Sequence, residues 1–563
     1  MAQGYLKCST AKQQMEEVGN QFVKMFFMNS FFQDAFSEYD EIISFKMHDL
    51  MHDLAMLVAG GDYCCLDSEA EKVEGRPMHV SLESCEAIHL LKSLDPSRLR
   101  TLILPDDLEE EEDLSVITEF KYLRVLRMHH LSDSTEHLKH LRYLVLTQQK
   151  SLPKSISNLV CLQTLKLKGC DKESFSEVVT KLVNLRCLDV ADYDSVSGMA
   201  GLGKLCSLQL LSTFVVRDSQ EIKYGTLNEL KDLNLRGELR IEHLNRVRDV
   251  ALESQYVNLR EKKFLRSLTL DWSYGDIIRN SDSLQLLENL QPHRNLKHLE
   301  VNHYPGVLFP NWLSLLTNVV YISLSACYNC RCLPPLERLP YLESLNIQFL
   351  YELESIYLCE DGFAVNFFPS LKSLKLGHCP RLRGWRRRGD DIKDSHNLSL
   401  PLSFPHLSHL DVFRCPKLTF PNVENLKKLK ISDPMNLPKG WMQNLTSLES
   451  LHIGWCKSET LEEFETWFKD DTDCLPSLGK IVLYMCERLK ALPDWICNLS
   501  AIQHVMISGC RKLALLPEGM SGLINLKIFE VSRCSLLLKE CRTETSVVSR
   551  QIAHIPQIIL HDY

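Results

Sequence analysis

The chain has 563 residues, of which 45% are hydrophobic and 24% charged, the proportions of a globular protein. Its net charge of −9 argues against a surface for nucleic acid or anionic membrane over the whole molecule. The first 25 residues lack the apolar core of a signal peptide, and no later run approaches the ~20 apolar residues of a membrane span. We therefore expect a cytoplasmic chain with no membrane span and no nucleic-acid partner.

Residues 1–60 carry a helical pattern after Met47-His48-Asp49. Apolar residues recur there at helical spacing, and His48 shares a face with His52. Packing of an amphipathic helix is one reading of these residues. The run from His48 to His52 also approximates H-E-x-x-H, but Asp49 replaces Glu and no third ligand is indicated, which disfavours metal hydrolysis.

Residues 98–540 form a repeat array. Copies of L-x-x-L-x-L recur at spacings of about 23 residues, the period of a leucine-rich repeat. Each copy predicts a short strand with leucines inward and intervening residues outward. Stacking gives an α/β fold, a leucine-rich-repeat solenoid with one curved parallel sheet. The copies begin at Leu99, Leu123, Leu141, Leu162, Leu185, Leu265, Leu296, Val319, Leu342, Leu371, Leu407, Leu426, Leu448, Leu478, Ile502 and Leu526.

Many of the 21 cysteines stand three residues past a predicted strand. Because cysteine is compact and a weak S–H donor, we expect free thiols that satisfy backbone groups in the turn. Cys327 and Cys330 have C-x-x-C spacing, but no second pair stands at zinc spacing, so a metal site is disfavoured. The recurring positions are Cys170, Cys327, Cys379, Cys415, Cys456, Cys486, Cys510 and Cys534.

The segment from Gly198 to Lys204 fits the phosphate-binding pattern G-x-x-x-x-G-K. Leu205, however, replaces the Ser or Thr that would hold magnesium, and the preceding residues are not a buried apolar strand. We interpret the segment as a repeat whose strand is formed by residues 208–211.

Two charged clusters interrupt the array. The acidic run at 106–113 is interpreted as a solvated loop. The basic run from Arg381 to Arg388 contains Trp385 and could bind nucleic acid or act as an import signal. Acidic residues follow it directly, so a surface loop is the preferred reading.

The later repeats carry aromatic and arginine residues where the predicted strands face outward. Tyr, Trp and Arg dominate binding energy at protein interfaces. We therefore predict a partner-binding surface on the sheet, formed by Phe413, Arg414, Trp455, Tyr484 and Arg533.

The N-terminal motifs and the repeats together resemble one family. Met1-Ala-Gln-Gly4, Met15-Glu-Glu-Val-Gly19, residues 29–34 and the Met-His-Asp motif are similar in order and spacing to the winged-helix subdomain of an NB-ARC module. Leu-Pro-x-x-Ile segments such as residues 152–156 are similar to repeats of intracellular plant proteins. The chain thus resembles the C-terminal part of a coiled-coil-type NB-ARC leucine-rich-repeat disease-resistance protein of plants.

This resemblance implies four segments. Residues 1–60 are a partial, helical winged-helix subdomain that ends in the Met-His-Asp motif. Residues 61–97 are a linker and the entry to the repeats, residues 98–540 are the repeats, and residues 541–563 are a C-terminal tail similar to the usual family ending. The phosphate-binding loop and other upstream parts of the family are not in this sequence, so we expect an N-terminally truncated chain.

The resemblance also implies site residues. In the family the motif histidine contacts the phosphate side of ADP and helps to lock the resting state. By position this contact falls on His48, with Asp49 fixing the local turn and Met47 packing behind it. Because the upstream loop is missing, we expect no cofactor in this chain, whereas the full-length family binds ADP or ATP.

The implied function is recognition and autoinhibition in an intracellular plant immune receptor, through protein binding and without enzyme activity. The implied partners are a pathogen effector or a guarded host protein, and the missing nucleotide-binding module. Two alternatives stay open: part of an ADP/ATP switch, if the chain is a fragment of a longer product, or a generic repeat scaffold such as a ubiquitin-ligase substrate adaptor.

Overall fold

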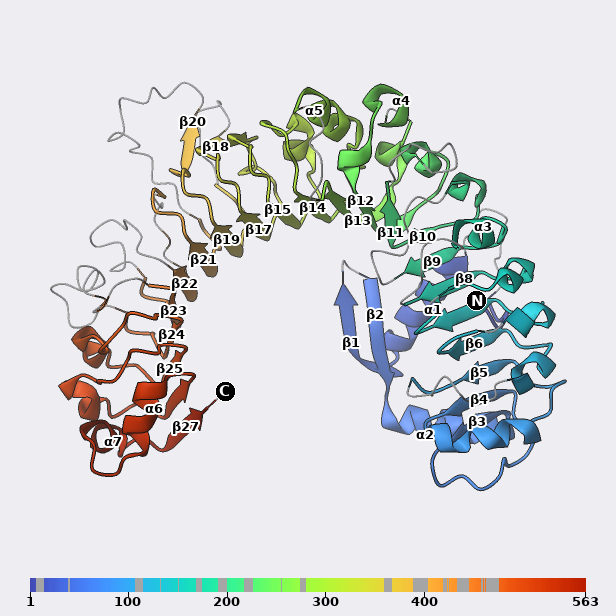
Figure 1. Cartoon of the computed structure of the whole chain (residues 1–563), viewed down its shortest axis with the longest axis horizontal. Helices are drawn as coiled ribbons and strands as arrows, with labels where there is room; N and C mark the ends of the chain where they lie inside the picture. Colours follow the sequence, from blue (N-terminus) through green and yellow to red (C-terminus); the bar gives the residue numbers. More distant parts are fainter. Residues whose placement is uncertain are drawn as a thin grey trace. The chain divides into compact units, whose positions relative to one another are not determined.

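The computed structural model describes residues 1–6, 15–38, 41–106, 115–131, 133–149, 151–168, 175–190, 200–216, 226–254, 256–273, 280–358, 367–387, 404–418, 423, 425–432, 445–456, 459, 461 and 475–562. These residues fall into two compact units, Met1–Ser273 and Tyr274–Tyr563. Each unit has its own run of parallel strands (Figure 1).

Unit 1 begins with two helices and a hairpin. The Phe27 and Phe45 rings lie 5.5 Å apart and the Phe32 and Phe45 rings 4.2 Å apart, so aromatic packing holds the first helix against the hairpin. The predicted helical segment of residues 1–60 therefore also contains an antiparallel strand pair. The elements are α1 (Met15–Met28), β1 (Phe32–Glu38), β2 (Glu41–Met47) and α2 (Asp49–Ala59).

Parallel strands begin soon after α2. The first two already pair in the repeat sheet, so this sheet starts within residues 61–97, which the sequence assigned to a linker and the entry to the repeats. Along its strands buried residues alternate with half-buried ones, which gives the sheet one core face. In order the eight strands are β3 (Tyr63–Leu66), β4 (His79–Leu82), β5 (Thr101–Ile103), β6 (Val125–Met128), β7 (Tyr143–Leu146), β8 (Thr164–Leu167), β9 (Cys187–Val190) and β10 (Leu210–Leu211).

A second parallel sheet starts within unit 1, so the repeat strands form two sheets where the sequence predicted one. The extended stretch 210–215 pairs with β9 through its first half and with β12 through its second half. Ser212 lies between the halves, and its hydroxyl accepts a hydrogen bond from the Val190 amide at 3.1 Å. The remaining elements of unit 1 are α3 (Phe175–Val179), β11 (Thr213–Val215), β12 (Arg236–Glu242), α4 (Val250–Ser254) and β13 (Phe264–Asp271).

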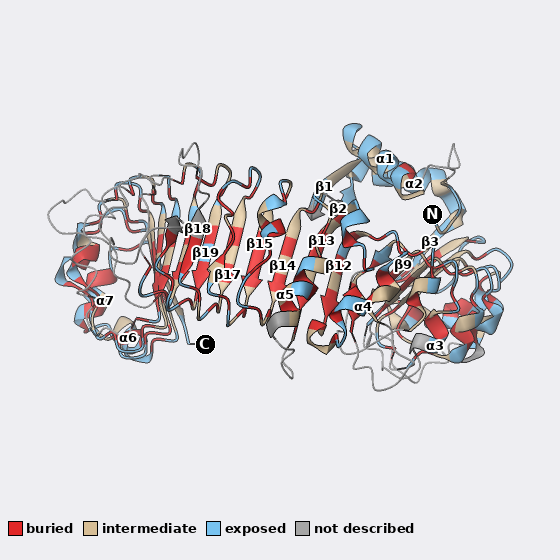
Figure 2. Ribbon diagram, turned by 90° about the horizontal axis from the view of Figure 1, so that it is seen from above, coloured by how far each residue is buried: buried red, intermediate tan, exposed pale blue. Residues whose placement is uncertain are grey.

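In unit 2 the strands pair in parallel, residue for residue. Leu299, Ile322 and Leu345 occupy one row of this register and are fully buried. Figure 2 shows the buried strand residues of this unit in red. The elements are α5 (Asn280–Asn289), β14 (His298–Asn302), β15 (Tyr321–Ser325), β17 (Ser344–Gln348), β19 (Ser373–Gly377), β21 (His409–Phe413), β22 (Lys428–Ser432), β23 (Ser450–Gly454), β24 (Lys480–Tyr484), β25 (His504–Ser508), β26 (Ile528–Ser532), α6 (Ser535–Arg542), α7 (Val547–Ile552) and β27 (Gln557–His561).

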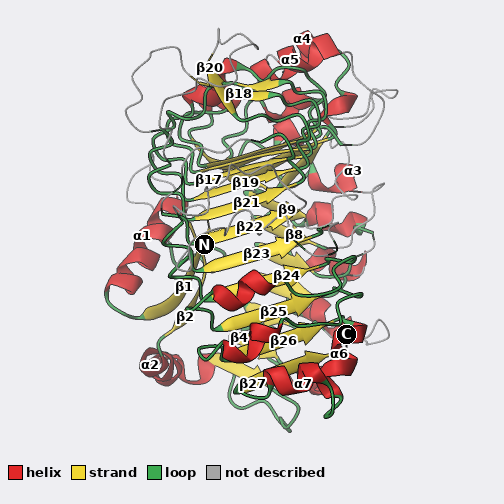
Figure 3. Ribbon diagram, turned by 90° about the vertical axis from the view of Figure 1, so that its left-hand side faces the viewer, coloured by secondary structure: helices red, strands yellow, loops and turns green. Residues whose placement is uncertain are grey.

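The repeat pattern predicted the strands well. Each of the sixteen copies has a strand that begins within two residues of its first apolar residue, and all of these first residues are buried. The segment expected as a C-terminal tail contains α7 and β27, and β27 pairs in parallel with β26. Figure 3 shows β21 to β26 side by side, with α6 and α7 near the last of them.

The recurring cysteines are buried free thiols, as expected. From Cys327 onward, each donates from its sulfur to the carbonyl two residues earlier, at S···O distances of 3.2–3.7 Å. The Cys534 sulfur also accepts from the Cys510 amide at 3.2 Å. A thiol therefore satisfies the backbone at the turn after the strand. Cys170 lies outside the described residues.

The basic run at 381–388 is not a simple surface loop. A small parallel sheet of unit 2 consists of β16 (Cys332–Leu333), β18 (Ser355–Leu358) and β20 (Trp385–Arg387). Trp385 is buried against the Phe367 and Phe404 rings, and Arg381 forms an ion pair with Glu352. The cluster thus contributes to packing. Arg388 lies outside the described residues, as do residues 107–113 of the acidic run.

Candidate regulatory and recognition surfaces

His48 begins α2. Its Nδ1 accepts a hydrogen bond from the Leu50 amide at 3.3 Å, and its own amide donates to the Phe31 carbonyl at 3.0 Å. The ring thus caps the helix while the main chain ties it to the hairpin. Met47 and Asp49 are exposed on either side. The phosphate contact expected of His48 stays a prediction.

The apolar residues after His48 form the predicted helix, but they are not buried. Leu50 and Leu57 are 73% and 79% exposed, and Phe22 of α1 is 45% exposed. Figure 2 shows α1 and α2 mostly in the colour of exposed residues. These apolar side chains of α1 and α2 are therefore in contact with solvent in this structure.

A row of arginines connects the repeats of unit 1 to its first residues. Each arginine follows the first leucine of a repeat, just before the strand. Arg124 donates to the Gln3 carbonyl at 2.5 Å, and Arg142 donates to the Ala2 carbonyl at 3.4 Å. The side-chain amide of Gln3 in turn donates from its Nε2 to the Thr101 hydroxyl at 2.6 Å.

The strongest contact of this row joins α1 to Arg186, the residue before β9. Arg186 donates to both carboxylate oxygens of Glu16, at 2.9 and 2.8 Å. The side chains are only 24% and 16% exposed, so water screens the pair weakly. We name Arg124, Arg142 and Arg186 the arginine row. Sequence reasoning missed it, although the recurring Leu-Arg dipeptide was a visible signal.

The phosphate-loop pattern at 198–204 has an internal partner. The amides of Gly201 and Gly203 donate to the Glu229 carboxylate at 2.9 and 2.7 Å. Leu202 and Leu205 are fully buried. The amides that would hold a phosphate therefore hold a carboxylate, and the reading as a repeat is confirmed for residues 200–211. Gly198 lies outside the described residues.

The five predicted partner-binding residues occupy two kinds of position. Phe413 and Tyr484 end β21 and β24 and are half-buried. Arg414, Trp455 and Arg533 lie one residue beyond their strands, at φ of 51°, 55° and 53°. Placing these three between buried leucines was wrong, because the chain leaves the sheet there through a left-handed residue. Their partner role stays a prediction.

Several lysines lie on the strands of unit 2 that carry Phe413 and Tyr484 or lie next to them. Lys375, Asp411, Lys430 and His452 lie in one register row of β19, β21, β22 and β23. Lys428 and Lys480 share the adjoining row. We name Lys375, Lys428, Lys430 and Lys480 the lysine ridge. Burial first, and then the charges of Lys428, Lys430 and Lys480, lower the pKa of His452 to about 4.

Tyr484 is held at the edge of the lysine ridge. Its hydroxyl lies 3.1 Å from the Ser432 hydroxyl, and the Lys430 ammonium lies 5.2 Å from its ring centroid. Phe413 instead contacts the His378 ring and the Arg414 guanidinium. The two aromatic residues thus belong to separate contact groups on the same face.

No group of three or more His, Cys, Asp or Glu residues in the described part of the chain could hold a metal ion. Within the same residues, no helix has the length and apolar character needed to cross a bilayer.

Two family models match the chain. One describes the winged-helix domain of disease resistance proteins and matches residues 1–55, and the other describes R13L1/DRL21 leucine-rich repeats and matches residues 227–350. A leucine-rich-repeat protein of Leptospira interrogans aligns with 86% of this chain and 99% of its own, at 18% identity and a TM-score of 0.37.

Plant proteins match over more of the chain. RGA4 of Solanum bulbocastanum is 31% identical and aligns with 100% of this chain and 57% of its own length. Disease resistance protein RGA2 of the same species is 30% identical over 83% of this chain and 46% of its own length. RPP13-like protein 1 of Arabidopsis thaliana is 28% identical over 95% of this chain and 53% of its own. The chain spans about half the length of these relatives.

Proposed function

The chain belongs to the plant disease resistance proteins that combine a winged-helix domain with leucine-rich repeats, and from this premise we propose that it is the recognition and autoinhibition portion of an intracellular immune receptor. It acts by binding proteins and not by catalysis, and it works in the cytoplasm. The contact between Glu16 and Arg186 carries this proposal.

Autoinhibition follows from the arginine row. A winged helix that changes position with the signalling state needs a contact that can form and break as a unit. The Glu16 pair and the two backbone contacts connect this segment to repeats that lie more than one hundred residues away in sequence. We infer that the row holds the winged helix in its resting position.

The exposed apolar side chains of α1 and α2 support a second contact, with another protein module. Leu50, Leu57 and Phe22 present apolar surface to water, which favours a protein partner. We propose that this surface receives a nucleotide-binding module, and that His48 then faces its ADP or ATP. In this arrangement the module binds the nucleotide, and this chain senses whether the nucleotide is ADP or ATP.

Recognition is assigned to the sheet of unit 2. The lysine ridge and the neighbouring aromatic residues form one outward face, and the pKa of His452 keeps that ring neutral near pH 7. A positive face with aromatic anchors suits an acidic protein surface. We propose that such a surface belongs to a pathogen effector or to a host protein that the receptor guards.

The autoinhibition proposal is tested by reversing the charge of Arg186. In Arg186→Glu the glutamate faces Glu16, so the contact is lost, at a cost of about 1.5–3 kcal/mol for a hydrogen-bonded charge. We expect the amides of α1 to exchange with deuterium faster in the purified chain. In a fusion to a relative's nucleotide-binding module, we expect signalling without a pathogen.

The double variant Glu16→Arg with Arg186→Glu restores opposite charges and should restore slow exchange and the silent state. Lys139→Glu changes the same charge at an exposed residue outside the row and serves as the control. If Arg186→Glu leaves both exchange and signalling unchanged, or if the charge swap rescues neither, the arginine row does not hold the resting state.

A further inference from the structure

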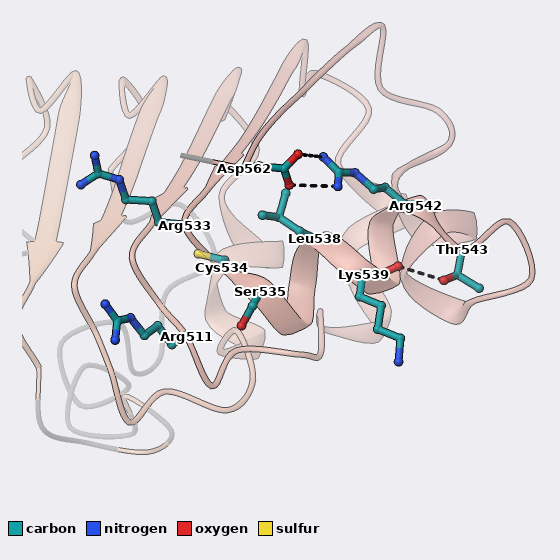
Figure 4. Close-up of a pocket in the computed structure, with 9 residues that line it drawn as sticks. All are labelled: Arg511, Arg533, Cys534, Ser535, Leu538, Lys539, Arg542, Thr543 and Asp562. Carbon is teal, nitrogen blue, oxygen red and sulfur yellow. Dashed lines mark hydrogen bonds and ion pairs between the residues drawn. The ribbon is translucent and has the colours of Figure 1, made fainter.

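A cavity of about 630 Å³ lies at the C-terminal end of unit 2. One wall is a single face of α6, with Ser535, Leu538, Lys539 and Arg542 at helical spacing. The other residues come from the turns after β25 and β26, from the C-terminal end of α6 and from the residue after β27 (Figure 4). They are Arg511, Arg533, Cys534, Thr543 and Asp562.

The lining is strongly positive. It contains the cations Arg511, Arg533, Lys539 and Arg542 against one carboxylate, Asp562. Asp562 is already engaged, because Arg542 pairs with it at 2.9 Å. Among the described residues, no carboxylate forms an ion pair with the three other cations. Figure 4 shows Arg511 and Arg533 on one side of Cys534 and Lys539 on the other.

Four cations against one engaged carboxylate give the lining a net positive charge, which attracts a polyanion. Guanidinium groups bind phosphate through paired N–H donors, and an ammonium adds a point charge. Helix α6 begins at Ser535 in the wall without a side-chain cap, which adds backbone donors of the same polarity.

The volume decides between a single ion and a larger ligand. Cavities for small molecules measure about 300–1,000 Å³, and 630 Å³ lies within this range. We propose that this cavity binds a compact small molecule that carries several phosphate groups, of the inositol polyphosphate class. The ligand joins the last two repeat turns to α6 and β27.

The test uses the purified chain and inositol hexakisphosphate as the probe, measured by calorimetry at low and at moderate salt. We expect stoichiometric binding that weakens as salt rises, because the contacts are ionic. Arg511→Ala combined with Arg533→Ala should weaken binding at least tenfold, and Lys539→Ala should weaken it further. The control is Lys512→Ala with Lys527→Ala, which removes two exposed charges of the same repeats outside the cavity.

Asp562→Asn separates a binding role from a structural one. It neutralises the carboxylate of the described lining and releases Arg542, so a binding cavity should bind the probe more tightly, whereas loss of a structural ion pair alone would not tighten it. Thermal unfolding shows whether each variant is folded. Absence of binding by the folded wild-type chain, or equal binding by the arginine variants, overturns the proposal.

A second arm identifies the source of the phosphates. Vesicles containing phosphatidylinositol bisphosphate are offered with and without soluble inositol hexakisphosphate. Binding of the soluble probe alone assigns a free metabolite, and vesicle binding that the soluble probe displaces assigns a lipid headgroup to the same cavity. Vesicle binding that survives both the probe and the arginine substitutions contradicts the assigned cavity. None of these readouts depends on immune signalling.

Discussion

At the scale of one residue, the groups around His452 determine the pKa of its ring. Its side chain lies in a row of β23 between Lys430 of β22 and Val482 of β24, and its Nε2 lies 2.9 Å from the Ser450 hydroxyl. Burial and the positive charges of Lys428, Lys430 and Lys480 hold its pKa at about 4. The ring therefore contributes polarity and shape to the lysine ridge without adding a fifth charge.

This lowered pKa makes a prediction about acid stability. Between pH 6.5 and about 4 the unfolded chain binds a proton at His452 that the folded chain does not, so stability falls as the pH falls through this window. We expect His452→Gln to lose less stability than the wild type between pH 7 and pH 5 in thermal unfolding. His137→Gln, at an exposed histidine, is the control. Parallel profiles for wild type and His452→Gln would disprove this role.

At the scale of the elements, a residue without a side chain lets two neighbouring strands fit together. Gly454 ends β23 beneath the Tyr484 ring of β24, and a Cβ at this glycine would lie 2.2 Å from Tyr484 Cζ. A glycine here lets the ring reach the Ser432 hydroxyl two strands away. The position of Tyr484 on the recognition face thus depends on its neighbour having no side chain.

Gly454→Ala should therefore displace the Tyr484 ring. We expect a loss of about 1–3 kcal/mol in unfolding free energy, the usual cost of overpacking, together with a change in tyrosine fluorescence. Gly479→Ala is a matched control in the next repeat, because a Cβ there meets nothing within 4 Å. Equal unfolding temperatures for the two variants would show that the ring moves at no cost.

At the scale of the whole molecule, a solenoid has no central core, so its ends need protection. Unit 2 ends with β27 on β26 and with α7, whose Val548 and Ile552 are buried. Residues first expected to be a tail therefore cover the last repeat. An uncovered β26 would expose a row of unpaired backbone groups, which promotes association between chains.

Removal of residues 547–563 should expose this edge. We expect a lower unfolding temperature and association that grows with protein concentration, measured by light scattering. Ile552→Ala should lower stability by about 2–4 kcal/mol because it leaves a cavity. Val547→Ala, which is 69% exposed in the same helix, should change little. A truncated chain that stays monomeric and equally stable would contradict the capping role.

The sequence by itself determined the strands and the buried thiols. Their signals are local: leucines at alternate positions indicate a half-buried strand, so each predicted copy matched within two residues. Cysteine at one repeat position likewise predicted a donor to the turn, as the Cys415 contact to the Phe413 carbonyl shows.

Only the tertiary structure decided which distant residues meet. Glu16 and Arg186 are ordinary charges in the sequence, and the path of the chain across 170 residues brings them together. The same holds for Trp385, whose basic neighbours suggested solvent although the ring is buried. A periodic pattern specifies which face of a strand is buried, because that depends on neighbours along the chain. The partner of an outward side chain depends on the packing of elements that no local pattern encodes.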